Sequence, residues 1–295
     1  MTKIPVKTIS LSNGETYAYR EMGTGSKVLI LLHGNMSSSL FFDELFEKMP
    51  EEEFKIIAPD MRGFGDSTYN TPVKKMKDFS DDLKLFVDAL NLQNFALCGW
   101  SAGGIVAMQF AIDHPDYVNK LVLLASGSIK GFPVQKTNFI GKPIPGKYIT
   151  SSEEMAKLFK PIINAYAKKK SVLVKMMINK SFFIVKKPDE ERVAAYIEEI
   201  YKQRNLVDLN MGLTYFNISH EHNGVVEGSG EVDKITAPTL ILQGDKDNII
   251  TEGMLQATLK GFGDRAKFVR LENCGHALIT DCSEKIAQEI RAFIG

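Results

Sequence analysis

The sequence predicts an α/β fold, in which a mostly parallel sheet carries helices on both faces and a helical segment is inserted into the chain. Three observations support this. Short continuous apolar runs recur, as is typical of parallel strands buried on both faces. Stretches with helical spacing of apolar residues lie between these runs, and such alternation is typical of βαβ units. Between residues 129 and 232 the alternation stops.

The strand predictions begin near the N-terminus. Two stretches, Val6 to Leu11 and Thr16 to Arg20, flank Asn13-Gly14, a residue pair that favours a hairpin turn. The continuous apolar runs that follow lie at residues 28–32, 54–58, 95–98, 121–125, 239–242 and 268–271. Each of these stretches is a predicted strand of the sheet.

Helices are predicted between the strands from the spacing of apolar residues. In residues 82–90 the apolar side chains fall on one helical face. Residues 105–112 form a mostly apolar stretch that ends before His114-Pro115, and residues 283–294 repeat the amphipathic pattern. These helices complete the alternation on either side of the sheet.

The segment without strand signals divides the chain into two parts. Residues 1–128 and 233–295 form the predicted core, and residues 129–232 form a predicted helical lid (cap). Glycine and proline cluster at the start of this segment, and glycines recur at its end. The helix-like stretches within it are residues 152–168, 172–185, 188–204 and 206–217.

Composition and charge exclude several classes of function. The chain has 36 basic and 36 acidic residues, so we expect no nucleic-acid partner and no membrane partner. No apolar run is long enough to span a bilayer, and the start lacks an apolar signal region. Three cysteines, Cys98, Cys274 and Cys282, without CxxC spacing indicate neither a disulfide framework nor a zinc site. We therefore expect a cytoplasmic location.

The strongest motif is Gly99-Trp100-Ser101-Ala102-Gly103, which fits the pattern G-x-S-x-G. A strand run precedes it and a helical stretch follows it. A serine on such a sharp turn projects its hydroxyl above the sheet, and the flanking glycines leave room for the close approach of strand and helix. The context predicts that Ser101 is a nucleophile and not an idle turn residue.

A second motif, His33-Gly34-Asn35, follows the run at residues 28–32. A loop there can direct a backbone N–H at a developing oxyanion, with a second N–H coming from Ala102. We assign the first donor to Asn35, with Met36 as the alternative. His33 is interpreted as a structural residue that shapes the loop.

The acid and the base are predicted from the ends of the last two strands. Asp245 and Asp247 both follow Gly244, and the spacing favours Asp247 as the acid, with Asp245 shaping the turn. His276 follows the last strand and is the predicted base. A calcium loop built on the same aspartates is set aside because it lacks the required glycine.

These motifs, in the order Ser101, Asp247, His276, resemble the α/β-hydrolase superfamily in its lid-bearing branch. The stretch Asp60 to Ser67 is similar to a structural loop of that family. The resemblance covers nearly the whole chain. It implies an eight-stranded sheet, a helical lid after the sixth strand, and a serine hydrolase that needs no cofactor or metal.

The resemblance leaves three functions open. The first is hydrolysis of a small or medium, largely apolar ester, thioester or lactone through an acyl-enzyme on Ser101. The second is carbon–carbon bond hydrolysis of a diketone-like substrate, and the third is a slow-turnover ligand sensor that keeps the triad. In each case the partner is a small molecule. Trp100 and Phe183 are predicted to contact it, and the sequence indicates no oligomeric state.

Overall fold

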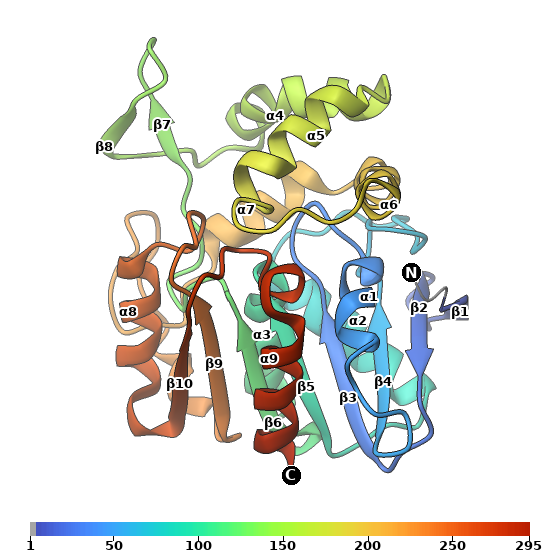
Figure 1. The fold of residues 1–295 in the computed structure, drawn as a ribbon. Coiled ribbons are helices and arrows are strands. Elements are labelled where there is room, and N and C mark those ends of the chain that lie inside the picture. Colours follow the sequence, from blue (N-terminus) through green and yellow to red (C-terminus); the bar gives the residue numbers. More distant parts are fainter. Residues whose placement is uncertain (1–3) are drawn as a thin grey trace.

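The structure, a computed structural model, describes residues 4–295 and is built on one eight-stranded sheet with helices on both faces (Figure 1). The strand order is β1-β2-β4-β3-β5-β6-β9-β10, with β2 antiparallel to both β1 and β4 at one edge and the remaining pairings parallel. The strands are β1 (Val6–Ser10), β2 (Thr16–Met22), β3 (Lys27–Leu32), β4 (Phe54–Pro59), β5 (Phe95–Trp100), β6 (Val118–Leu124), β9 (Thr239–Gly244) and β10 (Ala266–Leu271). The predicted fold class is thereby confirmed.

Each central strand contributes side chains to two separate hydrophobic cores, because successive side chains of a strand point to opposite faces of the sheet. In β3, Ile30 and Leu32 belong to the cluster on one face of the sheet, and Leu29 and Leu31 belong to the cluster on the other. All four are buried. This is why the central strands are apolar at every position instead of alternating with polar residues.

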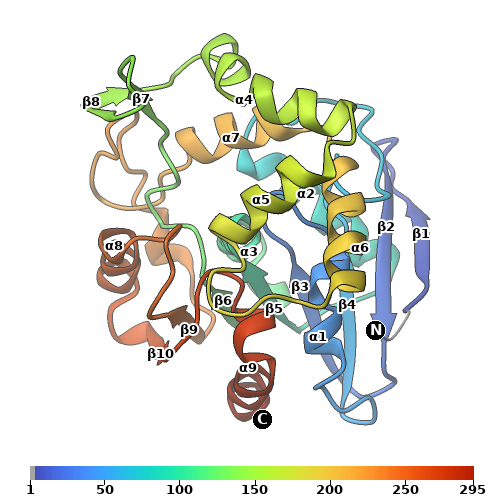
Figure 2. The same cartoon turned by 45° about the horizontal axis from the view of Figure 1, so that its top comes forward.

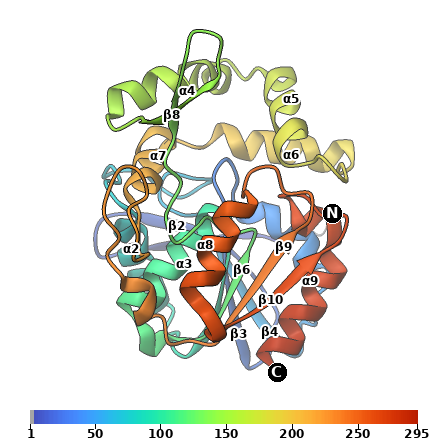
Figure 3. The same cartoon turned by 90° about the vertical axis from the view of Figure 1, so that its left-hand side faces the viewer.

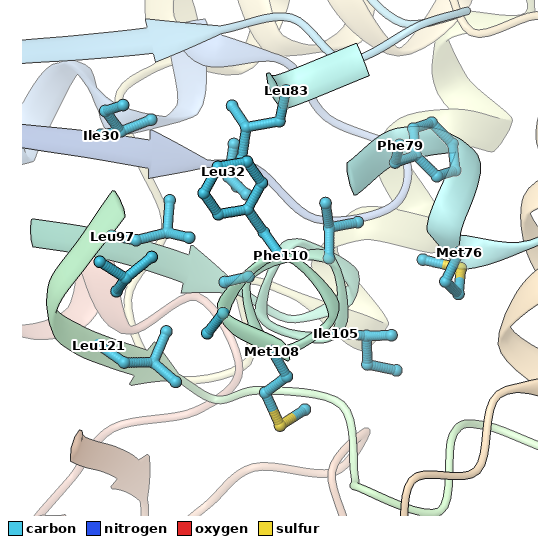
Figure 4. Packing of buried hydrophobic residues seen from close by; sticks show 14 of the residues in the cluster. Ile30, Leu32, Met76, Phe79, Leu83, Leu97, Ile105, Met108, Phe110 and Leu121 are labelled. Carbon is cyan, nitrogen blue, oxygen red and sulfur yellow. The ribbon is translucent and has the colours of Figure 1, made fainter. Parts of the chain in front are cut away.

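Two layers of helices cover these cores (Figure 3). Helices α2, α3 and α8 pack on one face, and α1 and α9 pack on the other. Figure 4 shows members of one of these cores, among them Phe79 and Leu83 of α2, Phe110 of α3, and Ile30 and Leu97 of the sheet. The helices are α1 (Asp43–Phe46), α2 (Met76–Ala89), α3 (Ala102–Asp113), α8 (Glu252–Phe262) and α9 (Leu278–Ile294), with short 3-10 turns at Ser39–Phe42, Pro115–Tyr117, Glu231–Lys234 and Gly263–Arg265.

In residues 129–232, the inserted segment, the helices and a hairpin lie together beyond the carboxyl-terminal ends of the parallel strands (Figures 1 and 2), whereas the end of the segment returns to the core beside α3 and α8. Four helices fall close to the predicted stretches: α4 (Ser152–Ala167), α5 (Ser171–Ser181), α6 (Glu190–Tyr201) and α7 (Leu206–Tyr215). The segment also contains an antiparallel hairpin, β7 (Gln135–Thr137) with β8 (Pro143–Tyr148), which the sequence did not predict. A three-residue strand and a strand with two prolines give no apolar alternation to detect. No helix within residues 4–295 is long and apolar enough to cross a membrane.

Candidate active site

Ser101 lies on the turn between β5 and α3, in a strained backbone conformation with φ 55° and ψ −120°. Its flanking glycines are required by contact distances. A Cβ on Gly99 would come within 2.3 Å of the Gly103 carbonyl oxygen, and one on Gly103 within 2.2 Å of the Leu32 oxygen. Backbone hydrogen bonds from Ser101 N to Leu124 O and from Gly127 N to Ser101 O hold the turn to β6. The strain is therefore stabilised by the surrounding strands.

His276 bridges Ser101 and Asp247. Its Nε2 lies 3.0 Å from Ser101 Oγ, and its Nδ1 lies 2.9 Å from Asp247 Oδ2. The His276 and Asp247 side chains are both 1% exposed. A carboxylate at Nδ1 favours the tautomer with its proton there, which leaves Nε2 free to accept the serine hydroxyl proton. The loop after β9 and the loop after β10 thus meet at the nucleophile.

Asp247 is held by three further donors. Its Oδ1 accepts hydrogen bonds from the N–H groups of Ile249 and Ile250, and its Oδ2 accepts one from Gln243 Nε2. Burial raises the pKa of Asp247. The hydrogen bond and the charge of His276, together with the two backbone donors, lower this pKa by a larger amount and leave it below its usual range. The carboxylate is therefore present at neutral pH. Sequence reasoning missed Gln243 because a glutamine inside an apolar strand carries no motif.

Asp245 has a different position in the same loop. Its Oδ1 accepts a hydrogen bond from Cys274 N at 3.1 Å, and its own N–H donates to Leu271 O. It therefore joins the two loops instead of contacting the imidazole of His276. Gly275, next to that histidine, is held by Asp281, whose Oδ2 accepts its N–H at 2.7 Å.

The cysteine expectation is wrong for two of the three residues. Cys274 and Cys282 form a disulfide, with their Cα atoms 6.6 Å apart, whereas Cys98 is free and buried. The pairing links the His276 loop to α9, whose backbone is non-helical at Cys282. The two cysteines are eight positions apart in the sequence, and the turn between β10 and α9 brings them together.

The predicted oxyanion donors flank the nucleophile. Gly34 lies so close to it that an added Cβ would be 2.9 Å from Ser101 Cβ. The N–H of Met36 donates to Asn35 Oδ1, whereas the described chain offers no hydrogen-bond acceptor to the N–H groups of Asn35 and Ala102. Both of these residues line the cavity beside Ser101. The geometry therefore favours Asn35 over Met36 as the first donor.

Two residues around this loop have structural roles. His33, which we interpreted as structural, is fully buried and accepts a hydrogen bond from Met61 N at its Nε2. Gln203 of the inserted segment donates to Asn35 Oδ1 at 2.8 Å and to Asn205 Oδ1 at 2.9 Å. Gln203 was not predicted, because its position next to the loop depends on how the inserted segment folds back.

A cavity of about 260 Å³ adjoins Ser101 and His276. Its wall is mainly apolar, with three polar side chains besides the pair just named, Asn35, Ser181 and Asn210. The apolar side chains on the wall are those of Met36, Ala102, Ile105, Phe132, Met177, Phe182, Leu213, Ile249 and Ile250. The inserted segment therefore supplies much of the surface that a substrate would meet.

Neither Trp100 nor Phe183 lines this cavity as the described residues form it, so the cavity wall does not support the substrate contact predicted for them. Trp100 is buried and its indole N–H donates to the backbone oxygen of His276 at 2.9 Å. Phe183 is buried and stacks on Tyr196, with ring centroids 6.1 Å apart. Its neighbour Phe182 lines the cavity instead.

Comparison with known proteins gives matches over most of the chain. Residues 27–281 match the family model described as alpha/beta hydrolase fold. The AB hydrolase superfamily protein YisY of Bacillus subtilis (strain 168) is 27% identical over 283 residues, covering 94% of this chain and 95% of that protein. A 2-hydroxy-6-oxononadienedioate/2-hydroxy-6-oxononatrienedioate hydrolase of Pseudomonas is 22% identical, covering 98% of this chain and 96% of its own.

Solved structures share the fold at lower identity. An esterase from Exiguobacterium antarcticum superposes with a TM-score of 0.74 at 19% identity, covering 98% of both chains. A putative lipase from Acinetobacter baumannii gives a TM-score of 0.75 at 22% identity, covering 99% of this chain and 91% of that one. At these identities the likeness extends to the fold alone.

Proposed function

This chain belongs to the α/β-hydrolase fold family, and from that premise we propose that it is a serine hydrolase of small to medium, largely apolar carboxylic esters. The observation that carries the proposal is the hydrogen-bonded series Ser101–His276–Asp247, with heavy-atom distances of 3.0 and 2.9 Å, at the wall of an apolar cavity. Nucleophile and base within hydrogen-bond reach, with the base oriented by a third group, is the arrangement needed for covalent acyl transfer.

The proposed cycle has two halves. His276 Nε2 takes the hydroxyl proton as Ser101 Oγ attacks the ester carbonyl, and the N–H groups of Asn35 and Ala102 stabilise the oxyanion. His276 then gives the proton to the departing alcohol, and an acyl-enzyme remains on Ser101. Water, activated by His276, releases the carboxylic acid and restores the serine. Asp247 orients the imidazole and stabilises its charged form in both halves.

Cavity size and chemistry support the substrate class. Ligand cavities commonly measure roughly 300–1,000 Å³, so a cavity of about 260 Å³ favours small or medium esters. Four apolar residues on its wall, Phe132, Met177, Phe182 and Leu213, belong to the inserted segment. We propose that this segment acts as a lid that selects apolar substrates.

Carbon–carbon bond hydrolysis is the second candidate, because relatives at 22–23% identity are named as dienedioate hydrolases. A dioate has two carboxylates, which are commonly bound by cationic side chains. The cavity wall described here contains no lysine or arginine. This difference favours an ester over a dicarboxylate substrate for the present chain. The preassembled triad likewise favours turnover over slow ligand sensing.

The cytoplasmic location stays a prediction. It rested in part on unpaired cysteines, and the disulfide between Cys274 and Cys282 removes that support. The proposed reaction itself calls for no cofactor or metal, as expected from the sequence.

The proposed function is tested with a panel of esters, thioesters, lactones and diketones, together with a serine-directed phosphonate. We expect ester turnover and addition of the phosphonate to Ser101. Ser101→Ala should abolish both, whereas Ser181→Ala, which removes another hydroxyl on the cavity wall, should retain both. Labelling of a different serine, or cleavage of the diketone alone, would contradict the proposal.

A further inference from the structure

The charge of the chain is balanced in total but unevenly distributed. Residues 129–189, which we call the outer segment, run from the start of the inserted segment to the residue before α6. They contain thirteen lysines, three acidic residues and no arginine. The outer segment therefore carries a formal charge of +10, and the rest of the chain carries −10. Overall neutrality, from which we expected no membrane partner, hides this segregation.

Exposed apolar side chains are concentrated in the same segment. Of the eleven large hydrophobic residues that the described chain exposes, nine lie in the outer segment. Phe139 is 99% exposed and Ile140 is 61% exposed, both at the tip of the β7–β8 hairpin. Val172 is 73% exposed near the start of α5. A protein rarely leaves such residues together in water without a partner for them.

The hairpin tip is an ordered turn. Asn138 Oδ1 accepts hydrogen bonds from the N–H groups of Ile140 and Lys142, and Asn138 O accepts one from Gly141 N. Gly141 has a φ of 78°, a conformation that glycine adopts without strain. These bonds hold the Phe139 and Ile140 side chains away from the body of the molecule.

Helix α5 connects this surface to the proposed active site. Val172, Leu173 and Met176 are exposed on it, whereas Met177 and Ser181 line the cavity beside Ser101. The hairpin, α4 and α5 lie on the side of the molecule remote from the C-terminus, as Figures 1 and 3 both show. One face of α5 is therefore exposed and apolar, and another face of the same helix covers the cavity.

Most of the outer lysines have no ion-pair partner among residues 4–295. The lysines in question are Lys142, Lys147, Lys160, Lys168, Lys170, Lys180 and Lys187. Free ammonium groups on long aliphatic stems can reach phosphate headgroups while the stems lie along apolar surface. Protein interfaces, in contrast, are enriched in arginine and depleted in lysine.

We propose that the outer segment docks on an anionic phospholipid surface, with Phe139, Ile140 and the exposed face of α5 entering the headgroup region and the lysines contacting lipid phosphates. Apolar residues that enter a bilayer while lysines contact anionic lipids form the usual basis of peripheral binding. Docking would bring the α5 side of the cavity to the surface where lipophilic esters partition. The inference is independent of the proposed hydrolase activity, because it concerns the outer face of the segment.

The test is flotation of the full chain with phosphatidylcholine vesicles that contain or lack phosphatidylglycerol. We expect binding to the anionic vesicles that weakens with salt. Neutralising Lys168 and Lys170 together to glutamine should reduce binding by about fivefold for each lysine. The matched control, Lys74→Gln with Lys285→Gln, removes two exposed lysines that lie elsewhere than in the outer segment, and it should leave binding unchanged.

The apolar contribution is tested separately at high salt. Phe139→Ser should reduce the residual binding, whereas Val6→Ser, a change at an exposed apolar residue on β1, should not. In Phe139→Trp, brominated lipids should quench tryptophan emission beyond that of the buried Trp100. All of these variants should hydrolyse a water-soluble ester like the wild type. Lack of binding to anionic vesicles, equal loss in the control variants, or binding only to an acidic protein would overturn the proposal.

Discussion

The indole N–H of Trp100 donates a hydrogen bond to the backbone oxygen of His276 at 2.9 Å. The residue before the proposed nucleophile therefore fixes the backbone of the proposed base, while Ser101 itself contacts the imidazole. Strand β5 places both contacts, because its last residue is Trp100 and Ser101 follows directly. The geometry of the site thus depends on a buried side chain that lies off the cavity wall.

Trp100→Phe should lower turnover with little change in KM. The substitution removes a hydrogen bond worth about 1 kcal/mol, and a barrier change of that size corresponds to roughly fivefold in rate. KM should stay near its wild-type value because Trp100 does not line the cavity. Steady-state kinetics on one ester distinguishes the two parameters. A large rise in KM with normal turnover would instead indicate that Trp100 contacts the substrate.

Asp247→Asn should reduce turnover by about 10⁴-fold, the effect of the equivalent substitution in serine proteases. An amide in place of Oδ2 would favour the wrong imidazole tautomer. Asp245→Asn should keep most of the activity, because Asp245 does not contact His276, and should lower the thermal stability, because a neutral amide oxygen is a weaker acceptor for the Cys274 N–H than a carboxylate. Turnover and melting temperature of both variants are the measurements. An inactive Asp245→Asn enzyme beside an active Asp247→Asn enzyme would reverse the assignment.

Gly34→Ala should inactivate the protein without unfolding it. The new Cβ would lie 2.9 Å from Ser101 Cβ and 3.4 Å from Trp100 O, so the serine or the donor loop must move. A displacement of about 1 Å at a reacting group can cost about 100-fold in rate. Gly253→Ala is the matched control, since its Cβ would meet nothing within 4 Å. Full activity in Gly34→Ala would show that the loop tolerates displacement.

Phe132→Ala should extend the substrate range to longer esters. Phe132 lines both the cavity at Ser101 and a second cavity of about 610 Å³ beneath the hairpin, so its ring forms a shared wall. Removing the ring should join the two spaces and raise kcat/KM for long acyl chains relative to short ones. Leu213→Ala enlarges the first cavity alone and is the control. The same chain-length profile in both variants would exclude the second cavity as an extension of the site.

Glu15→Gln should destabilise the fold at neutral pH and less so in acid. The buried Glu15 carboxylate accepts hydrogen bonds from the Thr68 hydroxyl and from the N–H groups of Asn70 and Thr71. Burial raises the pKa of Glu15, but these hydrogen bonds and the charge of Arg62 lower it by a larger amount, so the pKa lies below its usual range.

A lowered folded-state pKa means that the stabilisation is present above the pKa of the unfolded chain and is lost as the pH falls through the folded value. Glutamine resembles the protonated form, so the wild type and the variant should converge in acid. We expect a difference of about 1–3 kcal/mol in the free energy of unfolding at neutral pH. Urea denaturation of both proteins from neutral to acidic pH measures this difference in unfolding free energy. A difference that stays constant at every pH would contradict a stabilising role for the Glu15 carboxylate.

Local patterns in the sequence were sufficient for the sheet and for the approximate position of most large helices, although α8 was not predicted. Buried parallel strands are apolar throughout, and this signal survives without any knowledge of neighbours. Helix starts were predicted less well. Helix α2 begins at Met76 instead of Asp82, because five of the six residues 77–82 are polar. Helix α9 begins at Leu278 instead of Ser283, because a short helical turn precedes the non-helical residue Cys282. The short strands of the hairpin gave no pattern at all.

The sequence by itself determined the fold class and a small set of residues with the chemistry of acyl transfer, because a strand–turn–helix with glycines around Ser101 is a local feature. Only the tertiary structure decided which of two neighbouring phenylalanines faces the site. Phe182 and Phe183 are too close in sequence for a pattern to separate them, whereas for Asp245 and Asp247 the spacing already favoured the residue that contacts His276. The two phenylalanine side chains point in different directions, and their partners come from distant strands and helices. The disulfide between Cys274 and Cys282 was decided in the same way, by the turn that brings the start of α9 beside the end of β10.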